Sequence, residues 1–266
     1  MMEGEGMEWR NWWEAILELV FPGGNLCPFC GQNEIKGQDG VICTTCLKGV
    51  LSLKDTIPTC PRCGHFYAAN DCTNCLEWDN SLRKVLGVVP YEGVYRELIH
   101  NLKYSGRQEL SKPLGYLLAE TVKKSGLLGK VHLIIPVPLH PSRHKERGYN
   151  QSEWLAREAA RVLHLPLDGQ SMIREHFTKP QTGLGRQERL KNMEGAFRLR
   201  DNSKVLGRNI LLVDDIMTTG STLLACAHTL AEGGAGKIYG VVWAAGGGRN
   251  LGNNCRKEDI FWRIKT

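Results

Sequence analysis

Apolar residues gather in short runs along the chain, and segments with a helical repeat separate these runs. The runs predict buried strands at residues 85–91, 131–135, 210–214 and 237–244. Helical spacing of apolar residues continues through Leu98, Leu102 and 110–118, and it returns at 150–164, with Asn150 or Ser152 as the cap, and at 222–232. Strands that alternate with helices in this way predict an α/β fold built on a parallel sheet.

Two segments depart from this alternation. Residues 7–20 place tryptophan and aliphatic side chains at helical spacing, which predicts a short amphipathic helix docked on the rest of the protein. An interfacial membrane helix is the alternative, although its polar face is acidic rather than basic. Residues 178–193 are rich in Pro, Gly and Thr and show no periodicity, so we expect a long loop there.

Composition and charge narrow the class of protein. The apolar runs are far shorter than the roughly 20 residues needed to span a bilayer, and the acidic N-terminus lacks an apolar signal-peptide core, so we expect a cytoplasmic protein. The net charge of +6 resides in the stretch between His140 and Ile210, which holds 14 Lys and Arg residues against 8 Asp and Glu residues. Such a segment suits a polyanionic substrate or nucleic acid.

Eight of the ten cysteines lie in the first 75 residues, as four Cys-x-x-Cys pairs with gaps of 12, 13 and 8 residues between them. Each pair can present two thiolates to one tetrahedral ion, and two pairs complete an all-cysteine shell. We therefore predict two closed, structural zinc sites and a division of the chain into residues 1–24, 25–80 and 81–266. The predicted ligands are Cys27, Cys30, Cys43, Cys46, Cys60, Cys63, Cys72 and Cys75.

Disulfides, a redox pair and an iron–sulfur cluster are the alternatives for these cysteines. A reducing compartment disfavours disulfides, and a thioredoxin-like motif needs one pair rather than four in tandem. Pairing in sequence order is favoured over a cross-brace, in which alternate pairs would share an ion.

The stretch at residues 210–222 carries the most specific signal in the chain. A strand delivers two adjacent carboxylates, Asp214 and Asp215, and a turn rich in Thr, Gly and Ser then opens a helix. The carboxylates can accept hydrogen bonds from two ribose hydroxyls, and the backbone N–H groups of the turn can hold a monophosphate at the helix N-terminus. With the carboxylates, the predicted binding residues are Met217, Thr218, Thr219, Gly220, Ser221 and Thr222.

This stretch resembles the phosphoribosyl pyrophosphate (PRPP) signature of type I phosphoribosyltransferases. Residues 135–152 and 174–197 resemble two signatures of the ComF family, many members of which carry a Cys-rich front end. The resemblance covers nearly the whole chain. It implies a type I phosphoribosyltransferase fold, with a Rossmann-like parallel sheet and a small N-terminal double zinc ribbon. It also implies a cytoplasmic protein of natural transformation that acts on single-stranded DNA beside the DNA-uptake machinery.

The resemblance also assigns further residues to the site. The loop after the first strand of the fold binds pyrophosphate, which points to residues 138–143, and to His140 and Arg143 within them. A mobile loop that closes over PRPP corresponds to residues 178–192, with Lys179, Arg186 and Arg189 as cationic contacts. Lys103 and Arg107 also match a family pattern.

Several functions are compatible with this site. An active transferase would displace pyrophosphate from PRPP, with Mg²⁺ held near Asp214 and Asp215; Glu188 and His140 are guesses for a base, and the acceptor cannot be read. A DNA-uptake factor would bind PRPP or single-stranded DNA without turnover. Trp78, Tyr104 and Tyr149 are the residues that could stack on bases. A PRPP sensor would also fit the site, and so would a transferase of nucleotide or small-molecule metabolism unrelated to DNA uptake.

Overall fold

The structure is a computed structural model that describes residues 26–31, 42–66, 72–175, 193 and 195–246. The helix predicted at residues 7–20 lies outside the described residues, and so do Lys179, Arg186, Glu188 and Arg189 of the predicted loop. No helix in the described part of the chain is long and apolar enough to cross a membrane.

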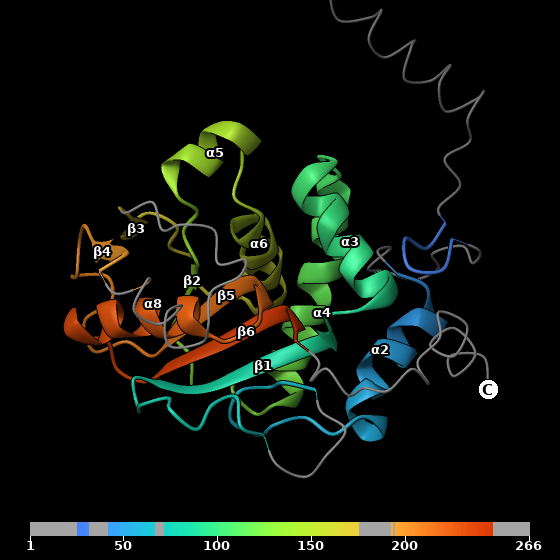
Figure 1. The fold of residues 1–266 in the computed structure, drawn as a ribbon, viewed down its shortest axis with the longest axis horizontal. Coiled ribbons are helices and arrows are strands. Elements are labelled where there is room, and N and C mark those ends of the chain that lie inside the picture. Colours follow the sequence, from blue (N-terminus) through green and yellow to red (C-terminus); the bar gives the residue numbers. More distant parts are fainter. Residues whose placement is uncertain (1–25, 32–41, 67–71, 176–192, 194, 247–266) are drawn as a thin grey trace, which may run out of the picture.

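A four-stranded parallel sheet forms the centre of the protein (Figure 1). Its strands lie in the spatial order β1-β6-β5-β2, and their bounds are β1 (Leu82–Pro90), β2 (Leu133–Pro136), β5 (Ile210–Met217) and β6 (Ile238–Ala245). The four predicted strands are confirmed, since strands covered on both faces need continuous apolar runs. β5 continues past its predicted end at Asp214 to Met217, so that Asp215 also lies in the strand. Asp214 lies opposite Val242 of β6.

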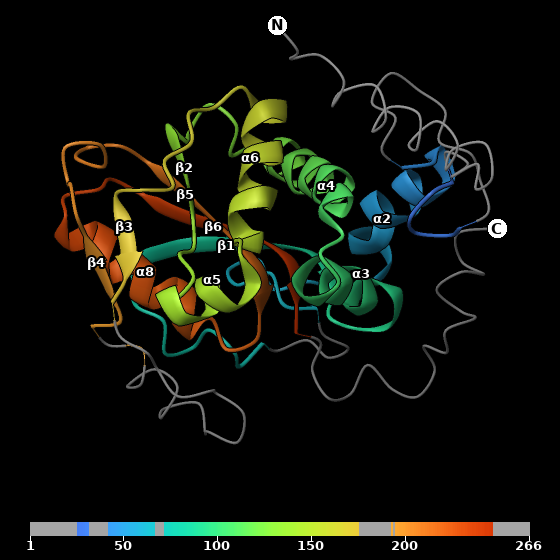
Figure 2. The same ribbon diagram turned by 90° about the horizontal axis from the view of Figure 1, so that it is seen from above.

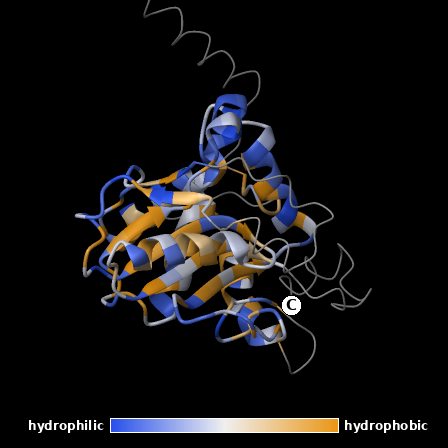
Figure 3. Cartoon of the chain, turned by 60° about the vertical axis from the view of Figure 1, so that its left-hand side comes forward, coloured by the Kyte–Doolittle hydropathy of each residue, from blue (hydrophilic) through white to orange (hydrophobic). Residues whose placement is uncertain are grey.

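Helices cover both faces of this sheet (Figure 2). Alternate side chains of β5 belong to different cores: Leu211 and Val213 pack with α4 and α6, whereas Ile210 and Leu212 pack with α8. Figure 3 shows hydrophobic side chains concentrated along the strands and hydrophilic ones on the outer helices. The covering helices are α3 (Gly93–Tyr104), the 3₁₀ turn η1 (Gln108–Leu110), α4 (Ser111–Lys124), α6 (Gln151–Leu163) and α8 (Ser221–Glu232).

A short helix and two short strands lie at the carboxyl end of the sheet. The helix α5 (Pro141–Arg147) follows β2, and β3 (Met172–Arg174) pairs with β4 (Phe197–Leu199) in a small antiparallel ribbon. The side chain of Asn150 caps α6 by accepting a hydrogen bond from the backbone N–H of Ser152 (3.1 Å), and it donates to the carbonyl of Val137 (3.0 Å). This double contact fixes the start of α6 against the loop after β2.

The cysteine-rich part packs on both sides of the sheet. We call residues 26–31 and 42–57, which include α2 (Thr44–Thr56), the first cysteine module, and residues 58–66 and 72–81 the second cysteine module. The first module joins the core of α3, α4 and α6, where the ring of Phe29 meets the edge of Trp243 at 6.0 Å between centroids. The second module joins the core of α8 through Phe66 and Trp78. The two modules therefore stabilise different layers.

Candidate functional site

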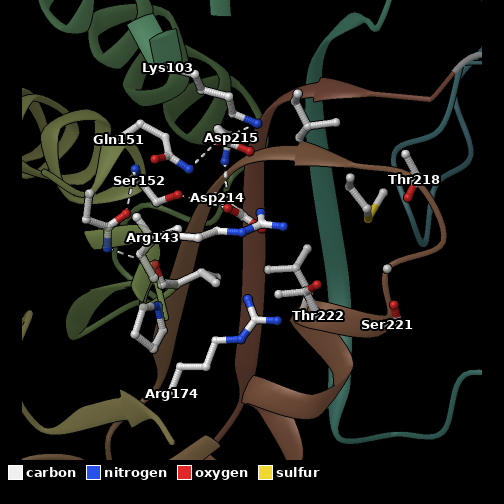
Figure 4. Close-up of a pocket in the computed structure, with 18 of the residues that line it drawn as sticks. Lys103, Arg143, Gln151, Ser152, Arg174, Asp214, Asp215, Thr218, Ser221 and Thr222 are labelled. Carbon is white, nitrogen blue, oxygen red and sulfur yellow. Dashed lines mark hydrogen bonds and ion pairs between the residues drawn. The ribbon is translucent and has the colours of Figure 1, made fainter. Parts of the chain in front are cut away.

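The two carboxylates of β5 lie buried at the carboxyl end of the sheet (Figure 4). Asp214 is 9% exposed and Asp215 is 4% exposed. The hydroxyl of Ser152 donates to Asp214 Oδ1 (2.8 Å), and the backbone N–H of Asp215 donates to the same oxygen (2.9 Å). These two donors fix the orientation of the Asp214 carboxylate.

Asp215 is held from two helices. The Nζ of Lys103, in the last turn of α3, lies 2.9 Å from Asp215 Oδ2. The amide of Gln151, the first residue of α6, donates to the same oxygen at 2.7 Å. Because Lys103 is itself largely buried, this ion pair is screened little by solvent. The end of β5 is thus tied to both helices.

Because the two carboxyl groups are adjacent and buried, it is unfavourable for both of them to be ionised. Burial, followed by the neighbouring charge of Asp215, raises the pKa of Asp214 from its ordinary value of 3.8 to about 7. Hydrogen bonds from the Asp215 N–H and from Ser152, and the charge of Lys103, act in the opposite direction. Hydroxyl donors or a cation brought to this carboxylate would favour its ionised form. The arrangement therefore suits a ligand with hydroxyl groups or a divalent ion.

The loop from β5 to α8 has the geometry of an anion cradle. Gly220 adopts a left-handed conformation (φ 82°) at the start of α8, and as a glycine it has no side chain to cap the helix. The N–H of Ser221 makes one long contact with the Thr219 hydroxyl (3.5 Å), which an anion can replace at the start of α8. The hydroxyls of Thr219 and Ser221 lie 3.1 Å apart. We call residues 218–222 the phosphate loop.

Cationic side chains face this loop across an open cavity of about 280 Å³. Arg143 reaches into the cavity from α5, and Arg174 does so from the end of β3. Figure 4 shows both guanidinium groups directed toward the space between the carboxylates and the start of α8. Burial lowers the pKa of Arg174, so an anionic ligand would offset the cost of holding its charge there.

An aromatic side chain lies at the edge of the same cavity. Tyr104 is 61% exposed, and the guanidinium of Arg147 lies 4.7 Å from the centroid of its ring. Arg147 donates to the Tyr104 hydroxyl (3.1 Å) and to Gln151 Oε1 (3.2 Å). This chain of contacts links the exposed ring to the residue that holds Asp215.

The prediction of stacking surfaces was wrong for Trp78, which is only 4% exposed because it packs in the core with α8. Tyr149 is also occupied: its ring stacks on Trp154 at 3.9 Å between centroids, and its hydroxyl donates to the carbonyl of Leu102 (2.7 Å). Of the three, Tyr104 is the one that is largely exposed, although its ring also contacts Arg147 and lies 4.6 Å from the ring of His100 between centroids.

The structure brings most of the predicted site residues together. Residues of the phosphate loop, Met217 and the two carboxylates line one cavity with Lys103 and Arg143. His140 is not among the described residues that line it; its Nδ1 accepts a hydrogen bond from the backbone N–H of Ser142 (3.2 Å) and so caps α5. Arg107 instead pairs with Glu109 at 2.7 Å on the surface.

Sequence reasoning missed five polar residues of the cavity. Arg147 ends α5, Asn150, Gln151 and Ser152 follow one another at the start of α6, and Arg174 ends β3. Their signal was present, because all five stand within the two stretches that carry the family resemblance. That resemblance indicated no role for them, because their roles depend on their position relative to the carboxyl end of β5, which only the folded structure shows.

The eight predicted cysteine ligands converge in two groups of four. Cys27, Cys30, Cys43 and Cys46 form one group and Cys60, Cys63, Cys72 and Cys75 form the other, with the ligand atoms of each group within 4.8 Å of one another. Sulfur–sulfur distances of 3.9 Å in the first group and of 3.6 and 3.5 Å in the second are close to the edge of about 3.8 Å that a tetrahedron with metal–sulfur bonds of about 2.3 Å has. Each group can hold a metal ion, and the pairs combine in sequence order.

Known proteins resemble this chain along most of its length. The family model for the phosphoribosyl transferase domain matches residues 127–261. The "DNA utilization protein YhgH" of Escherichia coli (strain K12) is 34% identical over 230 residues, which cover 85% of this chain and 97% of that protein. "Competence protein F" of Haemophilus influenzae is 32% identical over 223 residues (82% and 94%), and "Competence protein ComFC" of Bacillus subtilis is 31% identical over 203 residues (74% and 80%). An alignment of 230 residues is longer than residues 81–266, so the similarity extends into the cysteine-rich part.

Proposed function

Because the chain belongs to the ComF-like family of proteins with a phosphoribosyl transferase domain, we propose that it binds PRPP at the phosphate loop and acts on single-stranded DNA during DNA uptake. The names of the relatives, a DNA utilization protein and two competence proteins, support the cellular role. Two four-cysteine groups that can each hold a metal ion suit the reducing cytoplasm. We therefore place this function in the cytoplasm, beside the DNA-uptake machinery.

The observation that carries the PRPP proposal is the pair of buried carboxylates beside an uncapped helix start. Asp214 and Asp215 would accept hydrogen bonds from the two ribose hydroxyls, and the phosphate loop would hold the 5-phosphate. Lys103, Arg143 and Arg174 would face the pyrophosphate. Mg²⁺ prefers carboxylate, phosphate and water oxygens, so Asp214 and Asp215 would hold it, and it would neutralise the charge of the diphosphate.

Calorimetric titration tests this proposal with three ligands on the full chain. PRPP with Mg²⁺ should bind more tightly than ribose 5-phosphate or pyrophosphate alone. We call Lys103, Arg143 and Arg174 the cationic wall of the cavity; only PRPP engages both this wall and the phosphate loop. Equal affinity for pyrophosphate and PRPP would mean that the carboxylates and the phosphate loop contribute nothing, which contradicts the proposal.

Binding of single-stranded DNA should depend on Tyr104. Tyr104 is 61% exposed at the edge of the cavity, and a base would take the place of Arg147 over its ring. Stacking of one base on an aromatic side chain contributes about 1–3 kcal/mol. Tyr104→Ala should therefore weaken binding of a short oligonucleotide, measured by fluorescence anisotropy, by a factor of about 5 or more. Tyr104→Phe is the matched control, which keeps the ring and should bind nearly as well as the wild type. Loss of affinity in both variants would exclude stacking as the reason.

Zinc is the metal that we propose for both cysteine groups. Four thiolates per ion leave no open coordination position, so the sites would be structural rather than catalytic. Metal analysis of the purified chain should find about two zinc ions per molecule, and the protein should be colourless. Strong visible absorption would indicate an iron–sulfur cluster instead, and a folded native protein without bound metal would contradict both assignments.

Turnover is a second candidate function, and the cationic wall of the cavity favours it. Transfer would break the bond between the anomeric carbon of PRPP and pyrophosphate and would form a bond from that carbon to an acceptor nucleophile. Lys103, Arg143 and Arg174 lie where they would stabilise the departing pyrophosphate. Pyrophosphate release, measured with nucleobases, nucleotides and DNA as acceptors, tests it: release with a small molecule and not with DNA would favour a metabolic transferase unrelated to DNA uptake.

A further inference from the structure

The second cysteine module lies directly against the phosphate loop. The indole of Trp78 covers Gly220 so closely that a Cβ added to this glycine would overlap Cζ2 of the ring and lie 3.0 Å from Cε2 and Cη2. Trp78 is 4% exposed and packs with Met217 and Leu223, the residues on either side of the phosphate loop, in one apolar cluster. The tryptophan therefore forms the outer wall of the phosphate loop, on the side away from the cavity.

Two polar contacts join the same module to the chain before and after Gly220. The amide of Asn74, which lies between two cysteine ligands, donates to the carbonyl of Thr218 at 3.4 Å. The carboxylate of Asp79 lies 2.5 Å from Nε2 of His228, which projects from α8. The phosphate loop thus touches the module at its start and centre, and the helix that it opens is tied to the module as well.

The position of Trp78 depends on the cysteine group of this module. The last ligand, Cys75, precedes Trp78 by three residues, and the backbone N–H of Trp78 donates to the carbonyl of Cys75 (3.2 Å). Arg62, between the ligands Cys60 and Cys63, donates to the carbonyls of Cys75 (3.3 Å), Trp78 (2.7 Å) and Asp79 (2.7 Å). An ion that holds the four sulfurs would therefore also hold the segment that supports the phosphate loop.

The first cysteine module offers a natural comparison. It packs on the other face of the sheet, where Phe29 is 5% exposed against Trp243. Its buried residues belong to the cluster of α3, α4 and α6, and not to the cluster that contains Met217 and Leu223 on either side of the phosphate loop. Two cysteine groups of the same chemistry thus differ in their relation to the site.

We infer that Trp78 is a positioning residue of the phosphate loop, and that metal held by the second cysteine module controls PRPP affinity through Trp78, whereas metal held by the first does not. The inference rests on the proposed function for its ligand. If a ligand must order a loop when it binds, the entropy cost of ordering weakens its binding. If the loop is already supported, this cost is smaller and the ligand binds more tightly. Removing the support should therefore weaken PRPP binding without removing any group that touches the ligand.

Matched variants of the full, metal-loaded chain test this inference. Trp78→Ala removes the wall of the phosphate loop, Trp78→Phe keeps a ring there, and Phe29→Ala removes a comparably buried ring from the first module. Calorimetry should show PRPP binding weakened about 10-fold or more in Trp78→Ala, and changed less than about 3-fold in the other two variants. Backbone hydrogen exchange measured without ligand should rise in residues 216–224 of Trp78→Ala and stay unchanged there in Phe29→Ala.

The exchange measurement separates failure of the inference from failure of the proposed function. If the wild type binds no PRPP, the proposed function fails, and exchange in residues 216–224 still reports whether the module supports the phosphate loop. Unchanged exchange in Trp78→Ala, or equal PRPP weakening in Trp78→Ala and Phe29→Ala, would overturn the inference. Should Trp78→Ala fail to fold, Asn74→Ala and Asp79→Ala remove the flanking contacts singly, and the same localised rise in exchange is expected of them.

Discussion

Asp214→Asn and Asp215→Asn should each weaken PRPP binding about 10-fold or more, because each replaces a carboxylate that would accept a charge-assisted hydrogen bond worth about 1.5–3 kcal/mol. Calorimetry with PRPP and Mg²⁺ measures the loss. Asparagine keeps the shape of the side chain, and its Oδ1 can still accept from Ser152 and from the backbone N–H of residue 215 at position 214. Wild-type affinity in both variants would show that PRPP binds elsewhere.

The same two variants should change stability in opposite directions. The pKa of Asp214 is raised from 3.8 to about 7, so between these pH values the folded state binds more protons than the unfolded state. The free energy of unfolding therefore falls as the pH rises from about 4 to about 7. Asp214→Asn removes this loss and should stabilise the protein at pH 8, by an amount of the order of 1–4 kcal/mol, with little effect at pH 4.

Asp215→Asn serves as the control for this stability effect. It deprives the largely buried ammonium of Lys103 of its counter-ion, and an unpaired buried charge is strongly unfavourable. Denaturant unfolding at pH 4 and pH 8 distinguishes the two variants. A wild type whose stability does not fall between these pH values, relative to Asp214→Asn, would contradict the raised pKa. In that case the ionised Asp214 carboxylate of the binding site would not lower the free energy of unfolding at pH 8.

Gly220→Ala should destabilise the protein by about 2–5 kcal/mol, since the left-handed backbone costs a side chain about 1–2 kcal/mol and overpacking adds about 1–3 kcal/mol. The glycine has φ 82°, and an added Cβ would overlap the Trp78 ring. PRPP affinity should fall as well, because either the loop or the tryptophan must move. Chemical denaturation and calorimetry measure the two effects.

Gly126→Ala is a matched control for this prediction. Gly126 has a similar left-handed conformation (φ 71°), but nothing lies within 4 Å of its added Cβ, so it should show the backbone cost alone and keep PRPP affinity. In a Trp78→Ala background the additional cost of Gly220→Ala should shrink toward that of Gly126→Ala, since the clash is gone. Equal destabilisation by both glycine substitutions in the wild-type background would mean that Trp78 does not pack closely against Gly220.

The sequence by itself determined the features that depend on neighbours along the chain. The apolar run before Asp214 and the Thr/Gly/Ser turn after it predicted a strand, a pair of acids and a helix start, because each of these is formed by consecutive residues. The Cys-x-x-Cys pairs predicted two four-cysteine groups for the same reason, since the two sulfurs of a pair are brought together by one turn. The cap of α6 was also local, and Asn150 was one of two candidates for it.

Only the tertiary structure decided which distant residues complete the site. Gln151 reaches Asp215 across 64 positions of the chain, and Asn74 reaches Thr218 across 144. Such contacts depend on the order of strands in the sheet and on the face that each crossover helix covers, and periodicity reports only that a segment has an apolar face. The burial of Trp78 was misjudged for this reason. A tryptophan after a cysteine ligand is compatible with a stacking surface or a core position, and only the packing of the second module against α8 makes it the wall of the phosphate loop.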